Sequence, residues 1–266
     1  MSIKRTRQNG RLSARLFLLK EMVIRDVKAR YAGSSLGVVW AFALPVLWML
    51  IYTGVFGVIL RVPVEKGFAS FPEFLMAGLL PWMAIQEGIS RSATALTDNA
   101  AMVKKTVFPI EALVLSVVLA AAVNEVIALV VYAGYLAILG HLSLVWLPLA
   151  IPALLLQVVL TFGIGCFTAT VTTFVRDASH AVGIVLTVVF YATPIVYPSS
   201  LVPEKYRPIL NANPIAHLTE WYRCAFTLHR APDPASILYL VVFSAAVAVL
   251  GGALFFRARP HFADLI

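Results

Sequence analysis

Long uninterrupted runs of apolar residues dominate the pattern along the chain. No Lys, Arg, Asp or Glu lies between Ala32 and Leu60, and none lies between Val126 and Val175. A helix that spans a bilayer needs about 20 consecutive apolar residues. The first run therefore predicts one span, and the second predicts two spans separated by a turn at residues 140–143. Continuous runs, in place of short alternating segments, indicate helices and exclude a β-barrel.

The whole pattern predicts an all-α membrane protein with six transmembrane helices. The expected spans are residues 36–60, 74–92, 112–139, 147–175, 181–197 and 237–256, the second being the weakest because Glu87 lies inside it. One domain, 1–266, accounts for the chain: a cytoplasmic segment and interface helix (1–35), five spans (36–197), an outer segment (198–235) and a last span with its tail (236–266). Asn213 and Pro214 predict the start of a short helix in the proline-rich outer segment.

Composition and charge agree with this class and fix an orientation. The chain is 61% hydrophobic and 13% charged, whereas soluble domains are about 45–50% apolar and about 25% charged. With the N-terminus in the cytoplasm, fifteen of the 21 Lys and Arg residues fall on the cytoplasmic side. Basic residues beside spans favour that side, so N-in and C-in is predicted. The net charge of +8 is explained by topology, and no nucleic-acid partner is expected.

The segment at residues 16–31 mixes charged and apolar positions before the first span. On a helical wheel its apolar residues form one broad arc, made of Leu16, Phe17, Val23, Ile24, Val27 and Tyr31. Glu21/Arg25 and Asp26/Arg30 have the i,i+4 spacing of helical ion pairs. A helix lying on lipid is one interpretation. The acidic residues among the basic ones favour a protein partner in addition.

Aromatic residues recur along the first span and near the ends of others. Trp40, Trp48, Tyr52 and Phe56 are spaced by eight, four and four residues, which places them near one face of a helix. An interfacial aromatic belt is one interpretation. A conduit for sugars, which stack their apolar faces on aromatic rings, is the other, and the sequence favours neither.

Glu125 is the one carboxylate in the middle of the predicted third span. Such groups are costly in a membrane and frequently functional. No Lys, His or Asp chain accompanies it, so a polar contact between helices is favoured over a proton path. The five histidines lack metal-ligand spacing, and no phosphate-binding loop or nucleophile elbow occurs. We therefore expect no metal, no cofactor and no catalytic residue in this chain.

Four stretches carry a resemblance to a known family. They are residues 18–40 with Pro45, residues 99–109, residues 211–215 and residues 256–264. Together they resemble the permeases of type-2 ABC exporters. The four stretches most resemble those of the branch that exports O-antigen, teichoic acid and capsular polysaccharides. Within this branch they are most similar to the O-antigen exporter membrane subunit.

The resemblance implies a homodimer in the bacterial cytoplasmic membrane that exports a lipid-linked polysaccharide through a channel between two copies. Two ATP-binding subunits, one for each copy of this chain, would dock on the dimer and hold ATP and Mg. Short re-entrant gate helices would occupy about residues 199–230. The implied ATPase-coupling residues are Asp98, Asn99, Met102, Val103, Lys104, Lys105, Phe108, Arg176 and Asp177. The implied interface helix carries Lys20, Glu21, Arg25, Asp26, Lys28 and Arg30. The implied channel lining is Trp40, Trp48, Tyr52, Phe56, Tyr191 and Tyr197.

Two other functions remain open at this point. A type-2 permease for a small hydrophobic or drug-like molecule would share the fold. The compact first outer loop and the Gly-Ser-Ser-Leu-Gly junction at residues 33–37 favour the polysaccharide branch. An ion-coupled secondary transporter using Glu125 is the third possibility, and the lack of an internal repeat counts against it.

Overall fold

The computed structural model describes the backbone of residues 2–266 apart from 32, 35, 38, 65–66 and 105–107, and it describes the side chains of the same residues from 14 onward except that of residue 31. Every regular element in this part of the chain is a helix. The helices are α1 (Ser2–Tyr31), α2 (Val39–Tyr52), α3 (Phe71–Thr94), α4 (Ala100–Val103), α5 (Glu111–Ile138), α6 (Ala150–Phe174), α7 (Ala178–Ala192), α8 (Arg207–Asn211), α9 (Pro214–Arg223), α10 (Pro234–Ala258) and α11 (Phe262–Leu265). A π-helical stretch, Thr53–Ile59, continues α2.

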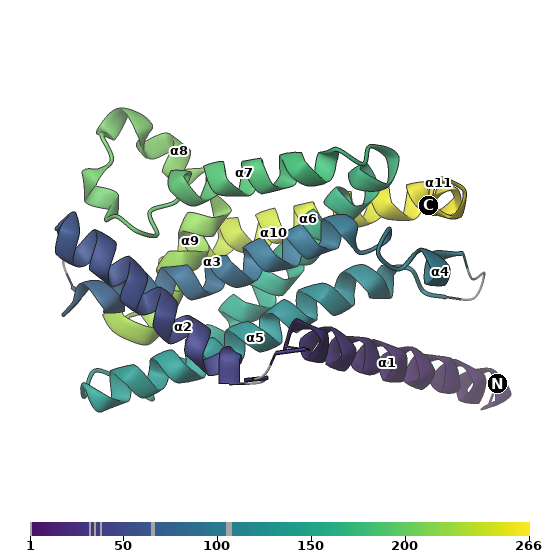
Figure 1. Cartoon of the computed structure of the whole chain (residues 1–266), viewed down its shortest axis with the longest axis horizontal. Coiled ribbons are helices and arrows are strands. Elements are labelled where there is room, and N and C mark those ends of the chain that lie inside the picture. Colours follow the sequence, from purple (N-terminus) through teal and green to yellow (C-terminus); the bar gives the residue numbers. More distant parts are fainter. Residues whose placement is uncertain (1, 32, 35, 38, 65–66, 105–107) are drawn as a thin grey trace.

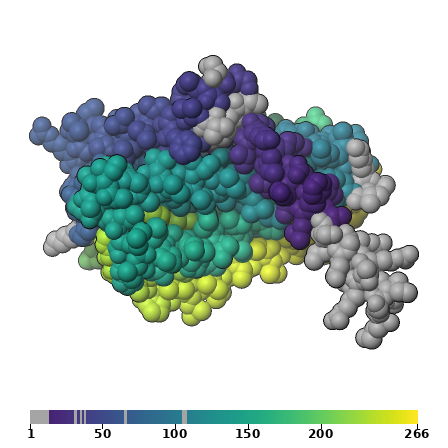
Figure 2. All heavy atoms as spheres, turned by 90° about the horizontal axis from the view of Figure 1, so that it is seen from below, coloured from purple at the N-terminus to yellow at the C-terminus, as the bar shows by residue number. Residues whose placement is uncertain are grey.

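The helices form an elongated bundle. α3, α5, α6, α7 and α10 run along its long axis, and α2 crosses it obliquely (Figure 1). Both termini and α4 lie at one end, and α8 lies at the other. α1 packs against α5 near the end that holds the termini and runs obliquely over the surface, as the purple atoms of Figure 2 show.

Four helical segments are long and apolar enough to cross a membrane: Val39–Ile59, Glu111–Ile138, Leu147–Phe174 and Pro234–Leu265. They coincide with the first, third, fourth and sixth predicted spans, so the all-helical membrane class is confirmed. Helices also occupy the other two predicted positions, as α3 and α7. α7 has 15 residues, fewer than the roughly 20 that a span requires, and it ends before Pro194. The total of six crossings stays a prediction.

α3, the weakest predicted span, is the most enclosed helix. It packs against α5, α6, α7 and α9, and Phe74, Leu75, Ala77 and Ile85 are fully buried. A helix surrounded by other helices does not have to be apolar against lipid. Its charged residues lie toward its two ends, Glu73 in the first turn and Glu87 and Arg91 in the last two turns.

Small residues bring the central helices close together. A Cβ atom on Gly163 of α6 would lie 2.6 Å from the Cα of Ala248 in α10, and Gly251 packs directly on the Gly163 carbonyl. On the other side of α6, a Cβ on Gly165 would meet the Ser92 hydroxyl at 2.6 Å. Membrane helices use such small residues because lipid supplies no hydrophobic force between helices and close packing must replace it.

The segment after α7 folds back against the bundle. Asn213 caps α9, accepting a hydrogen bond from the Ile215 amide at 2.9 Å, which confirms the predicted start of this helix. At its other end Arg223 is buried and donates to the Pro194 carbonyl at 2.8 Å. Its guanidinium also lies 3.9 Å from the centre of the Phe74 ring. This one side chain therefore joins α9 to α3 and to the break that follows α7.

Candidate functional site

The face that α1 presents to the bundle differs from the predicted apolar arc. Met22 and Asp26 are its buried side chains, with Leu19 half-buried beside them. Leu16 and Phe17 of the predicted arc are 59% and 62% exposed, whereas Val23, Ile24 and Val27 of the same arc are half-buried. A helical wheel ranks residues by polarity alone, so it could not place an acid in the contact. The acid is buried because α5 supplies a partner for it.

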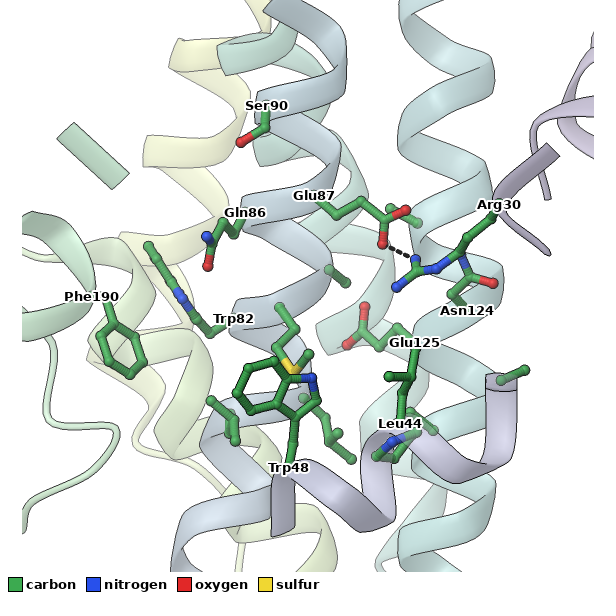
Figure 3. Close-up of a pocket in the computed structure, with 18 of the residues that line it drawn as sticks. Arg30, Leu44, Trp48, Trp82, Gln86, Glu87, Ser90, Asn124, Glu125 and Phe190 are labelled. Atoms are coloured by element: carbon green, nitrogen blue, oxygen red, sulfur yellow. Dashed lines mark hydrogen bonds and ion pairs between the residues drawn. The ribbon is translucent and has the colours of Figure 1, made fainter. Parts of the chain in front are cut away.

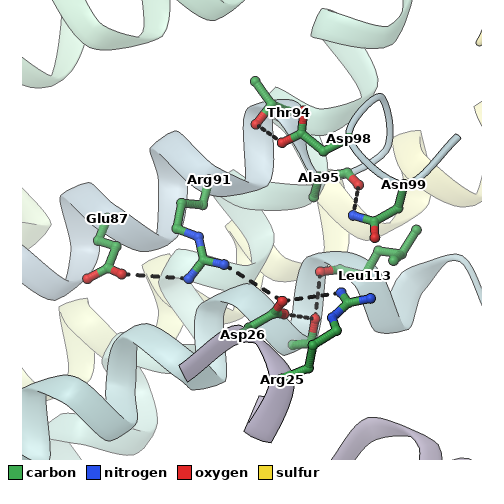
Figure 4. A network of polar contacts seen from close by, with 10 residues as sticks. Arg25, Asp26, Glu87, Arg91, Thr94, Ala95, Asp98, Asn99 and Leu113 are labelled. Atoms are coloured by element: carbon green, nitrogen blue, oxygen red, sulfur yellow. Dashed lines mark hydrogen bonds and ion pairs between the residues drawn. The ribbon is translucent and has the colours of Figure 1, made fainter. Parts of the chain in front are cut away.

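Asp26 is that buried acid, and it has three polar partners. The Ser116 hydroxyl of α5 donates to Asp26 Oδ2 at 2.8 Å. Arg25 lies 3.2 Å from Oδ1, and Arg91 of α3 lies 3.8 Å from the same oxygen (Figure 4). A buried carboxylate needs both charge compensation and hydrogen bonds, and this site supplies both. Asp26 thereby fixes α1 to α3 and α5.

A second ion pair continues this network toward the end of α1. Arg30 pairs with Glu87 of α3, and Glu87 also pairs with Arg91 at 3.7 Å. An acid and a base four residues apart on α1, Asp26 and Arg30, thus lie against a base and an acid four residues apart on α3, Arg91 and Glu87. The predicted pairing of Asp26 with Arg30 is wrong in the described structure, because both side chains turn to α3 or α5. Lys20, Glu21 and Lys28 are exposed.

The loop after α3 is held close to the helix that precedes it. The Thr94 hydroxyl donates to Asp98 Oδ2 at 2.7 Å, and the Asn99 amide donates to the Ala95 carbonyl at 2.9 Å. α4 is only four residues long. Asp98 and Lys104 are exposed, Met102 is half-buried, and Lys105 lies outside the described residues.

Val103 and the C-terminal tail share one hydrophobic cluster with α1. Val103 and Phe262 are buried in it together with Met22, and Phe108 packs against it. Val103 therefore contacts this chain's own core, unlike the exposed Lys104. The Phe262 ring meets the Phe255 ring edge-on at 5.1 Å between centres.

Arg259 adds polar contacts between the tail and the loop. It pairs with Glu111 at 3.3 Å and donates to the Phe108 carbonyl at 3.4 Å. From the sequence no contact is predicted for this tail, which is only one of the stretches that carry the family resemblance. The helical spacing of Phe255, Ala258 and Phe262, all buried, is the signal that could have revealed its contact with the loop.

Arg176 and Asp177 lie in the tight turn between α6 and α7, and both are exposed. A cleft of about 330 Å³ separates this turn from the loop after α3, lined among others by Thr97, Arg176 and Ile266. The structure therefore brings the predicted coupling stretches to the same end of the bundle. We call this surface the platform: α1 residues 19–30, loop residues 97–104 and 108–110, turn 175–179 and tail 259–266.

A larger pocket, of about 590 Å³, lies between α2, α3, α5 and α7 (Figure 3). Aromatic rings line much of it: Trp40, Trp48, Tyr52, Trp82, Phe190 and Tyr191. The Trp48 and Tyr52 rings lie 5.6 Å apart, and Trp82 and Phe190 lie 5.7 Å apart. The Trp40 indole is fixed by a 2.9 Å hydrogen bond to Ser34.

Four of the six predicted channel-lining residues meet in this pocket: Trp40, Trp48, Tyr52 and Tyr191. Phe56 stacks on Tyr52 at 5.9 Å but is not part of the lining. Tyr197 lies outside it as well, donating to the Tyr191 carbonyl at 2.7 Å. The prediction omitted Trp82 and Phe190, because the positions of α3 and α7 beside α2 are a tertiary feature.

The polar lining is divided between the mouth and the interior. Arg30, Glu87 and Arg91 line the end beside α1, which joins the pocket to the platform network. Glu125 of α5 lines the interior and is 3% exposed. It accepts a hydrogen bond from Gln157 of α6 through Oε2. This contact between helices agrees with the structural role that the sequence favoured for Glu125.

Comparison with known proteins gives consistent matches. Residues 18–227 match the ABC-2 type transporter family. An O-antigen export system permease protein RfbA of Myxococcus xanthus is 32% identical over 255 residues, covering 94% of this chain and 95% of that protein. An RfbA of Klebsiella pneumoniae is 32% identical over 252 residues with the same coverage. The polysialic acid transport protein KpsM of Escherichia coli is 27% identical over 91% of this chain and 93% of its own length. The chain therefore belongs to the permeases of the ABC-2 type transporter family.

Proposed function

We propose that this chain is the membrane subunit of an ATP-driven exporter that moves a lipid-linked polysaccharide across the bacterial cytoplasmic membrane. Two copies would form the channel. Full-length similarity to O-antigen export permeases and to a polysialic acid transport protein supports the substrate class. The resemblance of the junction at residues 33–37 supports the polysaccharide branch over a permease for small hydrophobic molecules.

The platform is the structural feature that most directly supports an ATP-driven exporter. Asp98, Lys104 and Arg176 project from it as exposed charged side chains, while Val103 and Phe262 anchor the same surface in the protein's own core. A rigid surface with exposed charges suits docking of a protein partner. We infer that an ATP-binding cassette subunit docks here, one on each copy, and that ATP and Mg bind to that subunit.

Docking at the platform would also connect the ATPase to the pocket. The loop that bears Asp98 follows α3 directly, and the Asp26–Arg91 and Arg30–Glu87 pairs bind α3 to α1. Movement of the platform would thus shift α1 and α3, whose residues line the mouth of the pocket. The aromatic set Trp40, Trp48, Tyr52, Phe56, Tyr191 and Tyr197 stays our proposal for the glycan path.

The topology follows from the same proposal. The platform end faces the cytoplasm, in agreement with its excess of Lys and Arg, and both termini lie there. α3 and α7 complete six crossings, and α8 and α9 act as gate helices at the outer face. Residues 1–266 form one permease domain.

Co-purification with an ATP-binding cassette subunit from the same cells tests the proposal. We expect a stable complex from wild-type membranes and a complex weakened at least tenfold by Lys104→Glu combined with Lys105→Glu. Lys205→Glu is the matched control, because Lys205 is exposed in the outer segment. Equal recovery of the ATPase from both variants would exclude docking at this loop.

A further inference from the structure

We propose that a groove between the C-terminal ends of α6 and α10 binds one anionic phospholipid, with an acyl chain against the apolar walls and the phosphate at Arg257 and His261. The inference goes beyond the proposed export function, because it concerns a lipid of the surrounding membrane and not the exported substrate. It rests only on the membrane class of this chain.

The groove is built from one side of each helix. α6 and α10 touch at Gly163 and Gly251, and the groove lies beyond this contact, nearer the platform. Its volume is about 420 Å³, within the range of about 300–1,000 Å³ that is usual for small-ligand sites. The lining residues recur at helical spacing in both elements. They are Thr170, Val171, Phe174 and Val175 from α6 and its end, and Leu254, Arg257, Ala258 and His261 from α10 and the turn after it.

The walls of the groove are apolar and stand at the end of two membrane helices. Leu147–Phe174 and Pro234–Leu265 are both long and apolar enough to cross a membrane. Phe174 and Val175 at the rim are 52% and 55% exposed. Thr170, the polar side chain on the α6 side, donates its hydroxyl to the Cys166 carbonyl of its own helix at 2.8 Å. Acyl chains are therefore the ligand that matches these walls.

Arg257 and His261 supply the polar end of the groove. Both side chains are exposed, and no Asp or Glu is among the lining residues. Within the described part of the chain, no acid forms an ion pair with either side chain. Arg259 shows the alternative, since it turns inward to Glu111 and the Phe108 carbonyl. The positive charge of Arg257 is thus available to an anion from outside the protein.

The two halves of the groove together select an anionic phospholipid. Basic pockets between membrane helices on the cytoplasmic side bind anionic head groups, and the platform end carries the excess of basic residues that marks this side. A free phosphate would match Arg257 and leave the apolar walls uncovered. A phospholipid with an ammonium group would bring a second positive charge toward Arg257.

A lipid in the groove would also hold the platform. His261 directly precedes Phe262, whose ring is buried against Phe255. A phosphate bound at Arg257 and His261 would fix the turn between α10 and α11 from the membrane side (Figure 1). We therefore expect added anionic lipid to raise the thermal unfolding midpoint of the wild-type chain more than that of Arg257→Gln.

Native mass spectrometry of the full chain in detergent tests the proposal by counting bound lipids directly. The probes are dioleoyl phosphatidylglycerol, dioleoyl phosphatidylethanolamine and, as a head group without chains, glycerol phosphate. We expect the first phosphatidylglycerol to bind about tenfold more tightly than phosphatidylethanolamine, because each basic residue near an anionic group contributes about fivefold. Excess glycerol phosphate should not displace the bound lipid.

Two variants separate the head-group end from the chain end. Arg257→Gln should weaken phosphatidylglycerol binding about fivefold and leave phosphatidylethanolamine binding unchanged. Arg15→Gln is its control, because Arg15 is also an exposed arginine but lies on α1, away from the groove. Leu254→Trp should fill the groove and weaken both lipids. Leu250→Trp is its control, since Leu250 is 70% exposed one turn earlier and is not part of the lining.

The proposal is overturned if the two phospholipids bind equally, or if Arg257→Gln keeps the wild-type preference. Equal losses in Arg257→Gln and Arg15→Gln would reduce the site to diffuse surface charge, and displacement by glycerol phosphate would reduce it to an anion site without a lipid. If Leu254→Trp does not fold, the Arg257→Gln and Arg15→Gln pair decides, because both residues are exposed. None of these results depends on ATPase docking or on glycan export, so the proposed function stands or falls separately.

Discussion

Asp26 of α1 accepts a hydrogen bond from Ser116 of α5 at 2.8 Å, and both side chains are buried. The two residues lie 90 positions apart in the sequence. Their contact places the N-terminal helix on the bundle, where Arg91 of α3 also reaches Asp26. The helix is thus held by a specific polar contact as well as by apolar area.

Asp26→Ala should detach α1 from α3 and α5. The substitution removes a charge-assisted hydrogen bond between α1 and α5 and a charge that compensates Arg91, while the Ser116 hydroxyl keeps the Leu113 carbonyl as an acceptor at 3.1 Å. We therefore expect a loss of roughly 1–3 kcal/mol. Thermal unfolding in detergent measures the effect as a lower midpoint. Glu21→Ala on the exposed face of α1 should leave the midpoint unchanged. Equal midpoints for both variants would show that Asp26 does not hold the helix.

Phe262→Ala should loosen the platform. The ring is fully buried against Phe255 and shares a cluster with Met22 and Val103, and a buried Phe→Ala change costs about 3–5 kcal/mol. We expect weaker co-purification of the ATP-binding subunit and faster proteolysis of the tail. Phe256→Ala is the matched control, because this neighbouring ring is 54% exposed. An intact complex with Phe262→Ala would argue that the tail does not support docking.

Gly251→Ala should destabilise the contact between α6 and α10. The added methyl group would collide with the Gly163 carbonyl, a backbone atom that cannot turn aside. Overpacking of this kind costs about 1–3 kcal/mol. Gly252→Ala provides the comparison, because a Cβ atom there meets nothing within 4 Å. The thermal midpoint of Gly251→Ala should fall below that of Gly252→Ala, and the reverse order would contradict the observed packing.

The sequence predicted the positions of the apolar helices because a membrane imposes length and polarity on each one separately. Hydropathy does not tell which helix the others surround, so the sequence predicts α3 as the weakest span because of Glu87. The structure shows that Arg30 and Arg91 pair with this glutamate. The start of α9 was predictable, because Asn213 caps the helix with a local hydrogen bond.

The site was predictable only in part. The aromatic spacing along α2 identified Trp40, Trp48 and Tyr52, since a helix places such residues on one side. Trp82 and Phe190 face them across the pocket, and such a relation between different helices has no local signal. For the same reason the sequence predicts a pair of Asp26 with Arg30, four residues further along the helix, and carries no signal for its contact with Ser116.

Surface display of polysaccharide tests the central claim most directly. In cells that lack this chain, the account predicts that the lipid-linked polysaccharide accumulates on the cytoplasmic side. Re-expression of the chain should restore surface polysaccharide only together with a hydrolysis-competent ATP-binding subunit. Normal surface polysaccharide in cells without this chain, or restoration without the ATP-binding subunit, would contradict the account.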